Sequence, residues 1–514
     1  MALTINGTSS ALALKTDTSN IGLGANAVDS ITTGDNNVGV GDNAGTAITE
    51  GVNNTAVGVN ALMSNTTGNR NNALGYAALQ NNTTGTHNVA IGKDAMMTNT
   101  TASENVAIGQ RAMYVNTTGA NNVSVGSSSM LDNTTGSANT AVGKHALYNN
   151  TTANHNTALG YITLQANATG TENLAAGSEA LENNTTGSEN TAVGYNALKA
   201  NTTASNGTAV GKTALTSNTT GANNTAVGRG ALRLCTTGGQ NVAVGFRASD
   251  ALTTASNNVS IGNQAAQDGT TAHSNVAVGG EALKNSTTSY KNTCVGMKAG
   301  LNISDGVGNV MVGNEAGQYT ASAHGNVAIG NGALGSNNVG NYNICIGQET
   351  RPSGNDHSTA IIIGKDVVGT QNQVHIGTNA GKIYNAFTSN ASWTQSSDER
   401  LKKNIQTNTL GLNFINDLRP VTYNWKKSTE IDSTDPHLVH HYDAETNHKD
   451  DTTTFHGFIA QEVKAALDTA GVDNHGAWDL QDDGVQGVSI EAMVTPLVKA
   501  VQELSAKVKA LEEA

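Results

Sequence analysis

The chain has 514 residues and a net charge of −13, with 13% of its residues charged and 4% aromatic. This acidic balance gives no indication of nucleic-acid binding, and the low charged fraction argues against disorder. The 58 glycines are accompanied by only 4 prolines, which excludes collagen and proline-rich tails, and three cysteines are too few for a disulfide framework.

Residues 1–20 form a serine- and threonine-rich lead-in that is too short to be a domain, so we expect at most an attachment role for it. The segment Met1–Gly7 lacks the basic start and the apolar core of a signal peptide. No stretch of the chain reaches the roughly 18 apolar residues of a membrane span. We therefore expect synthesis in a cytoplasm, without signal-peptide export and without membrane insertion.

A 17-residue repeat occupies residues 21–377. It is marked by a series of glycines that runs from Gly24 through Gly41 and Gly58 to Gly364 without a change of spacing. A fixed period of this length is typical of a solenoid. The sequence therefore predicts a mainly β protein, built on a parallel β-roll or β-helix of 17-residue coils.

The residues before each glycine predict a short strand. In Thr55–Gly58 the first and third strand residues share one face, and the small central residue lies on the other. Asparagine stands four residues before the glycine in 19 of the 21 coils, the exceptions being Gly207 and Ala360. Stacked asparagine amides can form a hydrogen-bonded ladder, and the glycine supplies a corner where a positive φ costs little.

The rest of the coil contains a second apolar pair, such as Ala61 and Leu62, and a polar turn such as Asn65–Gly68. Ordering a residue costs about 1–2 kcal/mol, and one coil buries too few side chains to offset that cost. We therefore expect each coil to be stabilised by its neighbours in the stack and by neighbouring chains. At about 4.8 Å per coil, the stack would be on the order of 100 Å long.

The end of the repeat is irregular. The small strand residue becomes larger at Met311, Cys345 and Ile362, as expected of a cap. Gly377 follows Gly364 by less than one full period, which predicts a terminal coil that is out of phase. Residues 378–396 are expected to be a linker or stem.

Charged residues, prolines and helical patterns begin at Ser397, so residues 397–514 are expected to form a second, small α+β domain. The predicted elements, in chain order, are a short helix over Asp398–Lys403, a helix over Leu410–Leu418, a strand over Val421–Trp425, a polar loop over Ser428–Thr454 and a helix over Phe458–Leu467.

The last helix, over residues 489–514, carries an apolar stripe whose members are alternately four and three residues apart. This is the a/d pattern of a coiled coil, and so regular a stripe faces partner helices rather than a globular core. Pro496 interrupts the pattern and either kinks the helix or marks its start. The stripe, called the seam below, consists of Ile490, Val494, Leu497, Val501, Leu504, Val508 and Leu511.

The segment Asn54–Gly58 and its equivalents read Asn-x-Ala-Val-Gly or Asn-x-Ala-Ile-Gly in many coils. This core resembles the head repeats of trimeric autotransporter adhesins, in which three chains form left-handed parallel β-rolls around one axis. The period here is longer, and the Asn-Thr-Thr-Gly turn is an addition. The resemblance implies a trimeric β-roll.

The C-terminal domain contains the segments Ser397–Ile405, Leu418–Tyr423 and His456–Val463, followed by the coiled-coil helix. In sequence and in order they are similar to the intramolecular chaperone auto-processing domain that ends many phage tail fibres and tailspikes. The resemblance implies a homotrimer whose C-terminal domain helps three chains fold in register and then cuts itself away.

The first of these segments holds a serine and a lysine five residues apart. A serine hydroxyl is a poor nucleophile unless a base takes its proton, and lysine can be that base when its pKa is lowered. On spacing alone, Ser397 can instead cap a helix while Lys402 is a solvated charge. The resemblance implies that Ser397 is the nucleophile, that Lys402 is the general base and that cleavage falls between Ser397 and Asp398.

Other candidate sites are weaker. Cys294 and Cys345 lie in one column three coils apart, too far for a disulfide, so we expect buried thiols. We expect no metal and no cofactor, because the histidines and aspartates of the polar loop are irregularly spaced; they are His437, His440, His441, His448, His456, Asp443, Asp450 and Asp451. Four aromatic residues follow their glycines directly and can stack on sugars or merely cover the roll: Tyr76, Tyr161, Tyr195 and Phe246.

The sequence as a whole indicates a homotrimeric tail fibre or tailspike-like protein of a bacteriophage virion, made in the host cytoplasm. Its expected partners are two further copies of the chain, a glycan or protein receptor on the host surface and other tail proteins. One alternative is a trimeric cell-surface adhesin, which should carry an export signal and a membrane anchor. A second is a polysaccharide-degrading tailspike, although no pair of carboxylates recurs along the repeat.

Overall fold

The computed structural model describes residues 12–14, 19–335, 339–386, 394–395, 399, 402–438, 442, 452, 454–473, 475–480 and 484–513. The chain divides into two compact units, Met1–Ser396 and Ser397–Ala514. Ser397 and Asp398, on which the expected cleavage site falls, lie outside the described residues. The two units are described separately below.

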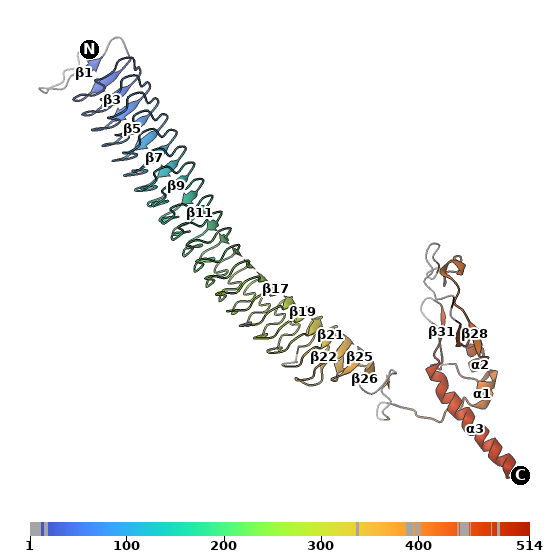
Figure 1. The fold of residues 1–514 in the computed structure, drawn as a ribbon. Coiled ribbons are helices and arrows are strands. Elements are labelled where there is room, and N and C mark those ends of the chain that lie inside the picture. Colours follow the sequence, from blue (N-terminus) through green and yellow to red (C-terminus); the bar gives the residue numbers. More distant parts are fainter. Residues whose placement is uncertain are drawn as a thin grey trace. The chain divides into compact units, whose positions relative to one another are not determined.

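The first unit is a solenoid of parallel strands stacked one per coil (Figure 1). Each strand pairs with the equivalent strand of the next coil, so that Val106 lies opposite Val123 and Ile108 opposite Val125. The predicted mainly β solenoid of 17-residue coils is therefore confirmed. Its three-residue strands are β2 Ile21–Leu23, β3 Val38–Val40, β4 Thr55–Val57, β5 Asn72–Leu74, β6 Val89–Ile91, β7 Val106–Ile108, β8 Val123–Val125, β9 Thr140–Val142, β10 Thr157–Leu159, β11 Leu174–Ala176, β12 Thr191–Val193, β13 Thr208–Val210, β14 Thr225–Val227, β15 Val242–Val244, β16 Val259–Ile261, β17 Val276–Val278, β18 Thr293–Val295, β19 Val310–Val312, β20 Val327–Ile329 and β21 Ile344–Ile346.

The interior of each coil is narrow. In the coil of β4, the central strand residue Ala56 and the following pair Ala61 and Leu62 are all buried, which confirms the second buried segment. The first and third strand residues point the other way and stay partly exposed. They form an aliphatic row along the sheet, called the sheet stripe below, whose most exposed members include Leu74, Ile91, Val123, Val142, Leu159, Leu174, Val193, Ile261 and Ile329.

Buried asparagines connect successive coils through the predicted amide ladder. The Nδ2 of Asn54 donates to Asn37 Oδ1 at 3.0 Å and to the Gly68 carbonyl at 2.9 Å. Its own Oδ1 accepts from the backbone N–H and the Nδ2 of Asn71. Every donor and acceptor of this buried amide is thus satisfied, as burial requires.

A second amide ladder, which the sequence analysis did not anticipate, runs through the polar turn. The Nδ2 of Asn82 donates to Asn65 Oδ1 at 2.7 Å, and Asn99 repeats the contact to Asn82. Threonine hydroxyls add a third series, as in the bond from Thr66 to the Thr83 carbonyl. The polar turn therefore supplies a second series of hydrogen bonds between successive coils.

The repeating glycine makes the predicted corner. Gly126 has a φ of +139°, and a Cβ added there would lie 2.5 Å from the carbonyl oxygen of Gly143 in the next coil. Most coils also have residues other than glycine at positive φ, for example Asn53, Asn60 and Leu62 at 60°, 60° and 52°. The chain therefore turns at several left-handed positions per coil, and at the corner glycine the next coil also excludes a side chain.

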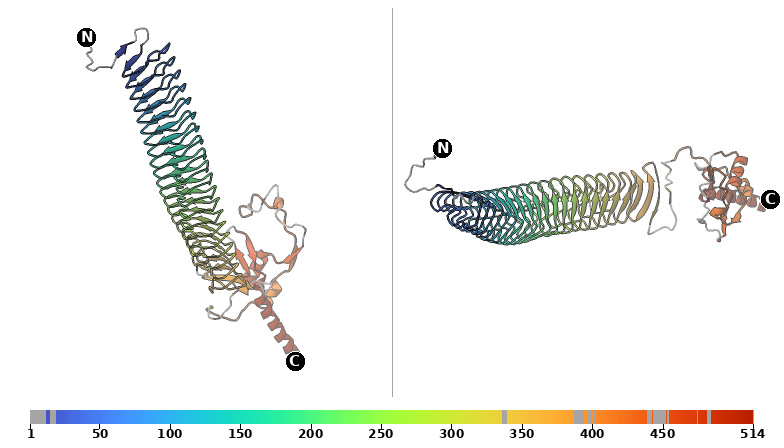
Figure 2. Two further views of the ribbon diagram at one scale, coloured as in Figure 1. Left: turned by 60° about the vertical axis from the view of Figure 1, so that its left-hand side comes forward. Right: turned by 90° about the horizontal axis from the view of Figure 1, so that it is seen from above.

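The two ends of the solenoid are capped by strands of opposite direction (Figure 2). At the start, β1 (Leu12–Leu14) pairs antiparallel with β2. At the end, β23 (Ile361–Lys365) pairs with β25 (Gln373–Thr378) so that Gly364 lies opposite Gly377, which confirms the out-of-phase coil. The strands β26 (Gly381–Ala386) and β27 (Thr394–Gln395), from the segment expected to be a linker or stem, continue the sheet antiparallel.

Two short strands, β22 (Arg351–Pro352) and β24 (Val368–Gly369), form a small parallel sheet beside this cap. The enlarged strand residues Met311, Cys345 and Ile362 are fully buried. Cys294 and Cys345 are free and buried as expected, and desolvation raises the pKa of each thiol to about 12.

The second unit is a small α+β unit. Its elements are α1 Leu412–Asp417, β28 Val421–Tyr423, the 3-10 turn η2 Ser428–Glu430, β29 Phe455–Gly457, α2 Ala460–Thr469, β30 Trp478–Leu480, β31 Gln486–Val488, the 3-10 turn η4 Glu491–Met493 and α3 Val494–Glu512. The predicted strand and the three later helices are present with shifted ends, and Pro496 lies in the first turn of α3, where it marks the start. The short helix expected over Asp398–Lys403 does not extend to Lys402 and Lys403, which lie outside any helix.

We predict that Gly126→Ala destabilises the first unit by about 2 kcal/mol or more, because the new Cβ meets the next coil at a strained φ. The midpoint of denaturant unfolding, followed by circular dichroism, measures the effect. The matched control is Gly280→Ala, since a Cβ at Gly280 has no atom within 4 Å. Equal midpoints for the two variants would contradict the corner argument.

We also predict that Asn122→Asp destabilises the unit, by more than about 2 kcal/mol at neutral pH. The Nδ2 of Asn122 donates to Asn105 Oδ1 and to the Gly136 carbonyl, and a carboxylate oxygen there would face two acceptors without a proton. The exposed neighbour gives the control Asn121→Asp, for which unfolding should be almost unchanged. Similar losses in both variants would mean that the ladder adds nothing.

Candidate functional site

The sequence-predicted cleavage site is described only on its C-terminal side. Lys402 is exposed, and its backbone N–H donates to the Glu399 carbonyl at 3.0 Å. Because Ser397 and Asp398 lie outside the described residues, the pairing of Ser397 with Lys402 stays a prediction. The same unit carries an apolar surface whose residues all lie among those that the structure describes.

The two later motif segments lie side by side although they are far apart in the sequence. β28 and β29 pair antiparallel, with Val421 opposite Gly457 and Tyr423 opposite Phe455. Just outside this pair, the guanidinium of Arg419 binds Glu462 of α2 through both carboxylate oxygens. The hydrogen bond from Arg419 lowers the pKa of the Glu462 carboxyl, so the pair is ionised at neutral pH.

Helix α3 uses one face to pack within its own chain. Pro496 and Ala500 are buried, and the Glu503 carboxylate accepts from the backbone N–H of Leu412 at 2.8 Å. That N–H is at the start of α1, where it has no partner within the helix and where negative charge is favourable. α3 is therefore fixed to α1 by small residues and a capping carboxylate.

Six of the seven seam residues lie on another face of α3, and Ile490 precedes the 3-10 turn η4. The seam contributes little to the core of its own chain. Its seven residues are each between 46% and 78% exposed, from Val508 to Leu511. From Leu504 onward, every described residue of the helix is exposed. A helix end with no tertiary support is marginal in water, and an apolar stripe on it is typical of a surface that other chains cover.

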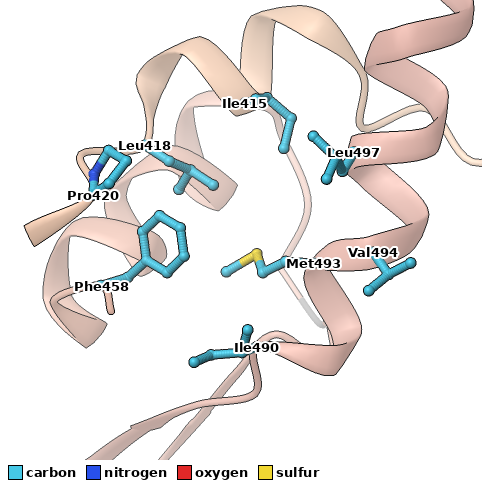
Figure 3. Close-up of a pocket in the computed structure, with 8 residues that line it drawn as sticks. All are labelled: Ile415, Leu418, Pro420, Phe458, Ile490, Met493, Val494 and Leu497. Carbon is cyan, nitrogen blue, oxygen red and sulfur yellow. The ribbon is translucent and has the colours of Figure 1, made fainter. Parts of the chain in front are cut away.

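An apolar groove of about 350 Å³ continues the seam onto the body of the unit (Figure 3). Phe458 and Met493 point toward one another at its centre. Its lining residues are Ile415, Leu418, Pro420, Phe458, Ile490, Met493, Val494 and Leu497. The first three seam residues thus form one wall of the groove, so groove and seam are a single continuous surface.

Sequence analysis identified the seam but missed the groove. The sequence places Ile415, Leu418 and Phe458 in predicted helices, and Leu418 and Phe458 also in the motif segments. Nothing in the local pattern indicates that these three side chains lie close together. One signal in the sequence could have indicated the groove. Apolar residues surround both Arg419 and Glu462, and the salt bridge between these two residues brings their segments together.

Among the residues that the structure describes, no helix combines the length and the apolar character needed to cross a bilayer. In the same part of the chain, no three His, Cys, Asp or Glu side chains are placed to hold one metal ion. Of the histidines and aspartates considered above, only His437 and His456 lie among the described residues.

Comparison with known families gives one match. The family model described as chaperone of endosialidase matches residues 397–472, which contain Lys402, α1, β28, β29 and α2. No curated protein and no solved structure matches the chain. This chain therefore carries a chaperone-of-endosialidase segment at residues 397–472, placed after a parallel β-solenoid of 17-residue coils.

Proposed function

We propose that the chain is the host-recognition fibre of a bacteriophage tail. Three copies assemble through the C-terminal unit, which aligns the solenoids and then releases itself by cleavage between Ser397 and Asp398. The observation that carries the proposal is the continuous apolar surface of seam and groove in a unit of the endosialidase-chaperone family. The lead-in of residues 1–20 is the proposed attachment to other tail proteins.

The seam supports a trimeric coiled coil. Its residues recur every 3.5 positions on average over about three heptads, as knobs-into-holes packing requires. The helix already packs on α1 through a different face, so association does not compete with folding of the unit. Two further copies of the same chain can therefore cover the seam while each unit stays intact.

The sheet stripe supports association of the solenoids as well. A row of aliphatic side chains, of which Leu74 is 48% exposed, runs along consecutive strands. Burial of apolar surface is worth about 25 cal/mol per Å², so a row repeated over many coils favours contact between parallel copies. No single coil has to contribute much.

A repetitive stripe cannot select its own register. If one chain slips by a single coil, most coils meet the same residue types, and only the last coil loses its partner. Register is weakly specified in such surfaces. The second unit is not repetitive, so three of these units associate in one alignment, and this supports its role as a clamp during folding.

The proposed cleavage needs a lysine that can act as a base. Lys402 is exposed in the single chain, whereas a lysine base requires burial or neighbouring cations to lower its pKa. We propose that trimer formation supplies this environment, so that cleavage follows assembly. Hydrolysis of the Ser397–Asp398 bond consumes one water and leaves a carboxylate on Ser397 and an amine on Asp398.

We predict that Ser397→Ala abolishes self-cleavage, because the attacking hydroxyl is lost. A denaturing gel and intact mass should show one full-length chain for the variant, and for the wild type a long fragment plus a fragment that begins at Asp398. The matched control is Ser396→Ala, which should be processed as the wild type. Processing of Ser397→Ala would rule out Ser397 as the nucleophile.

We predict that Val501→Glu and Leu504→Glu together disrupt the trimer and suppress cleavage, since buried carboxylates in a coiled-coil seam are costly. Light scattering measures the oligomeric state, and the gel measures processing. Gln502→Glu adds a charge to an exposed position of the same helix and serves as the control. Full cleavage in a monomeric double variant would separate processing from assembly.

A further inference from the structure

We propose that the first unit binds an anionic polysaccharide at a cationic patch formed by the coils of β12 to β15. The patch residues are Lys212, Arg229, Arg233 and Arg247, with Tyr195 and Phe246 at its ends. The inference rests on the proposed host-recognition function, because it names the chemistry of the receptor: a sugar polymer that carries carboxylate or phosphate groups.

The coil geometry places these residues in rows. Residues directly after the corner glycine recur once per coil, so Tyr195, Lys212, Arg229 and Phe246 stack in four successive coils. Three strand spacings separate the first from the last, about 14 Å. The row belongs to a different column from the sheet stripe, whose residues precede the glycine, so the two surfaces are distinct.

Each end of the row pairs an aromatic ring with a cation. Lys212 Nζ lies 5.6 Å from the ring centre of Tyr195, and Arg229 Cζ lies 5.7 Å from that of Phe246. Both rings are exposed, Tyr195 at 46% and Phe246 at 40%. An exposed aromatic face offers apolar surface for the C–H face of a sugar ring, while the adjacent cation attracts an acidic substituent.

Two further guanidinium groups are held in place by one buried carboxylate. Asp250 is 2% exposed and accepts hydrogen bonds from Nε and Nη2 of both Arg233 and Arg247, at 2.7 to 3.2 Å. A single carboxylate cannot neutralise two arginines. The Asp250 carboxylate instead fixes the planes of the two guanidinium groups, and this lowers the conformational entropy that the arginines lose when they bind an anion.

The charge of the patch is opposite to that of the protein. Four cationic side chains and one carboxylate leave it with a net charge of +3, in a chain with a net charge of −13. Within the described residues 19–335, neither Lys212 nor Arg229 forms an ion pair. Guanidinium groups bind carboxylates and phosphates through two parallel hydrogen bonds, so a polyanion fits this surface better than a neutral sugar does.

A cavity of about 290 Å³ lies among these groups, which is close to the size of small ligand sites. Its lining includes Arg229, Gly230, Arg233, Phe246, Arg247 and Asp250. The cavity exists because the column that holds Thr213 and Arg247 in the neighbouring coils holds glycine here. A Cβ at Gly230 would have no atom nearer than 3.6 Å, so a side chain there would occupy the cavity.

This glycine provides a test that removes no charge. Gly230 has a φ of +68°, but Asn60 and Asn196 occupy the same column at 60° and 58°, so Gly230→Asn is compatible with the backbone.

A second variant, Arg229→Ser, removes one positive charge. Serine already stands in the column of Arg229, directly after the corner glycine, at Ser127 and Ser178. Lys144→Ser makes the same change in the same column outside the patch, and is the matched control.

Binding of the full-length chain to immobilised polygalacturonate and phosphomannan measures the affinity, with neutral dextran as the uncharged probe. We expect binding to at least one of the two acidic polymers and none to dextran. Gly230→Asn and Arg229→Ser should each weaken it by about tenfold or more, and Lys144→Ser by less than about twofold. Preference for one acidic polymer identifies the acid group as carboxylate or phosphate.

The proposal is overturned if dextran binds equally, if neither acidic polymer binds, if Lys144→Ser weakens binding as much as Arg229→Ser, or if Gly230→Asn leaves the affinity unchanged. Equal binding of an oligothymidylate with the same variant losses would replace the sugar assignment. The measurement is repeated on Ser397→Ala, which separates the two proposals. Continued processing of this variant together with unchanged binding refutes the maturation scheme alone, whereas loss of its processing together with no binding to either acidic polymer refutes the patch alone.

Discussion

Contact between identical coils at one fixed spacing governs the whole first unit. The backbone of each coil passes so close to the next that a side-chain carbon at Gly126 would meet the carbonyl of Gly143. The same spacing brings each buried asparagine amide within hydrogen-bonding distance of the amide one coil away. Stability therefore comes from repeated neighbour contacts, as in other solenoids, and an amide such as that of Asn54, which would be costly to bury alone, is fully satisfied in the stack.

A stack of this kind has a thin core. Alanine, leucine and asparagine fill it, and the larger aliphatic residues of the strands remain on the outer face of the sheet. The second unit presents a comparable surface, since the seam and the groove leave leucine, valine and phenylalanine side chains partly open. In both units the single chain leaves apolar surface uncovered, and the proposed partners for that surface are further copies of the same chain.

The uniform backbone also explains how a repetitive solenoid can carry a binding site in only a few of its coils. Positions just after the corner glycine contribute little to the stacking, so their side chains vary from coil to coil without altering the scaffold. Where cations and aromatic residues occupy adjacent coils, and where Gly230 leaves room between them, the surface acquires a pocket and a net positive charge. The proposed recognition site and the stacking contacts thus lie in different columns of one repeat.

The sequence by itself determined the period, the strand before each glycine, the first asparagine ladder, the out-of-phase coil before Gly377 and the seam of the last helix, because each follows from local spacing. Tertiary structure alone decided the rest. The ladder through Asn65 and Asn82 forms only when the coil has closed, Arg419 meets Glu462 only when two distant segments pair, and Arg233 shares Asp250 with Arg247 only across a coil boundary. Such contacts depend on which segments the folded chain brings together, and the spacing of residues along the sequence does not specify those segments directly.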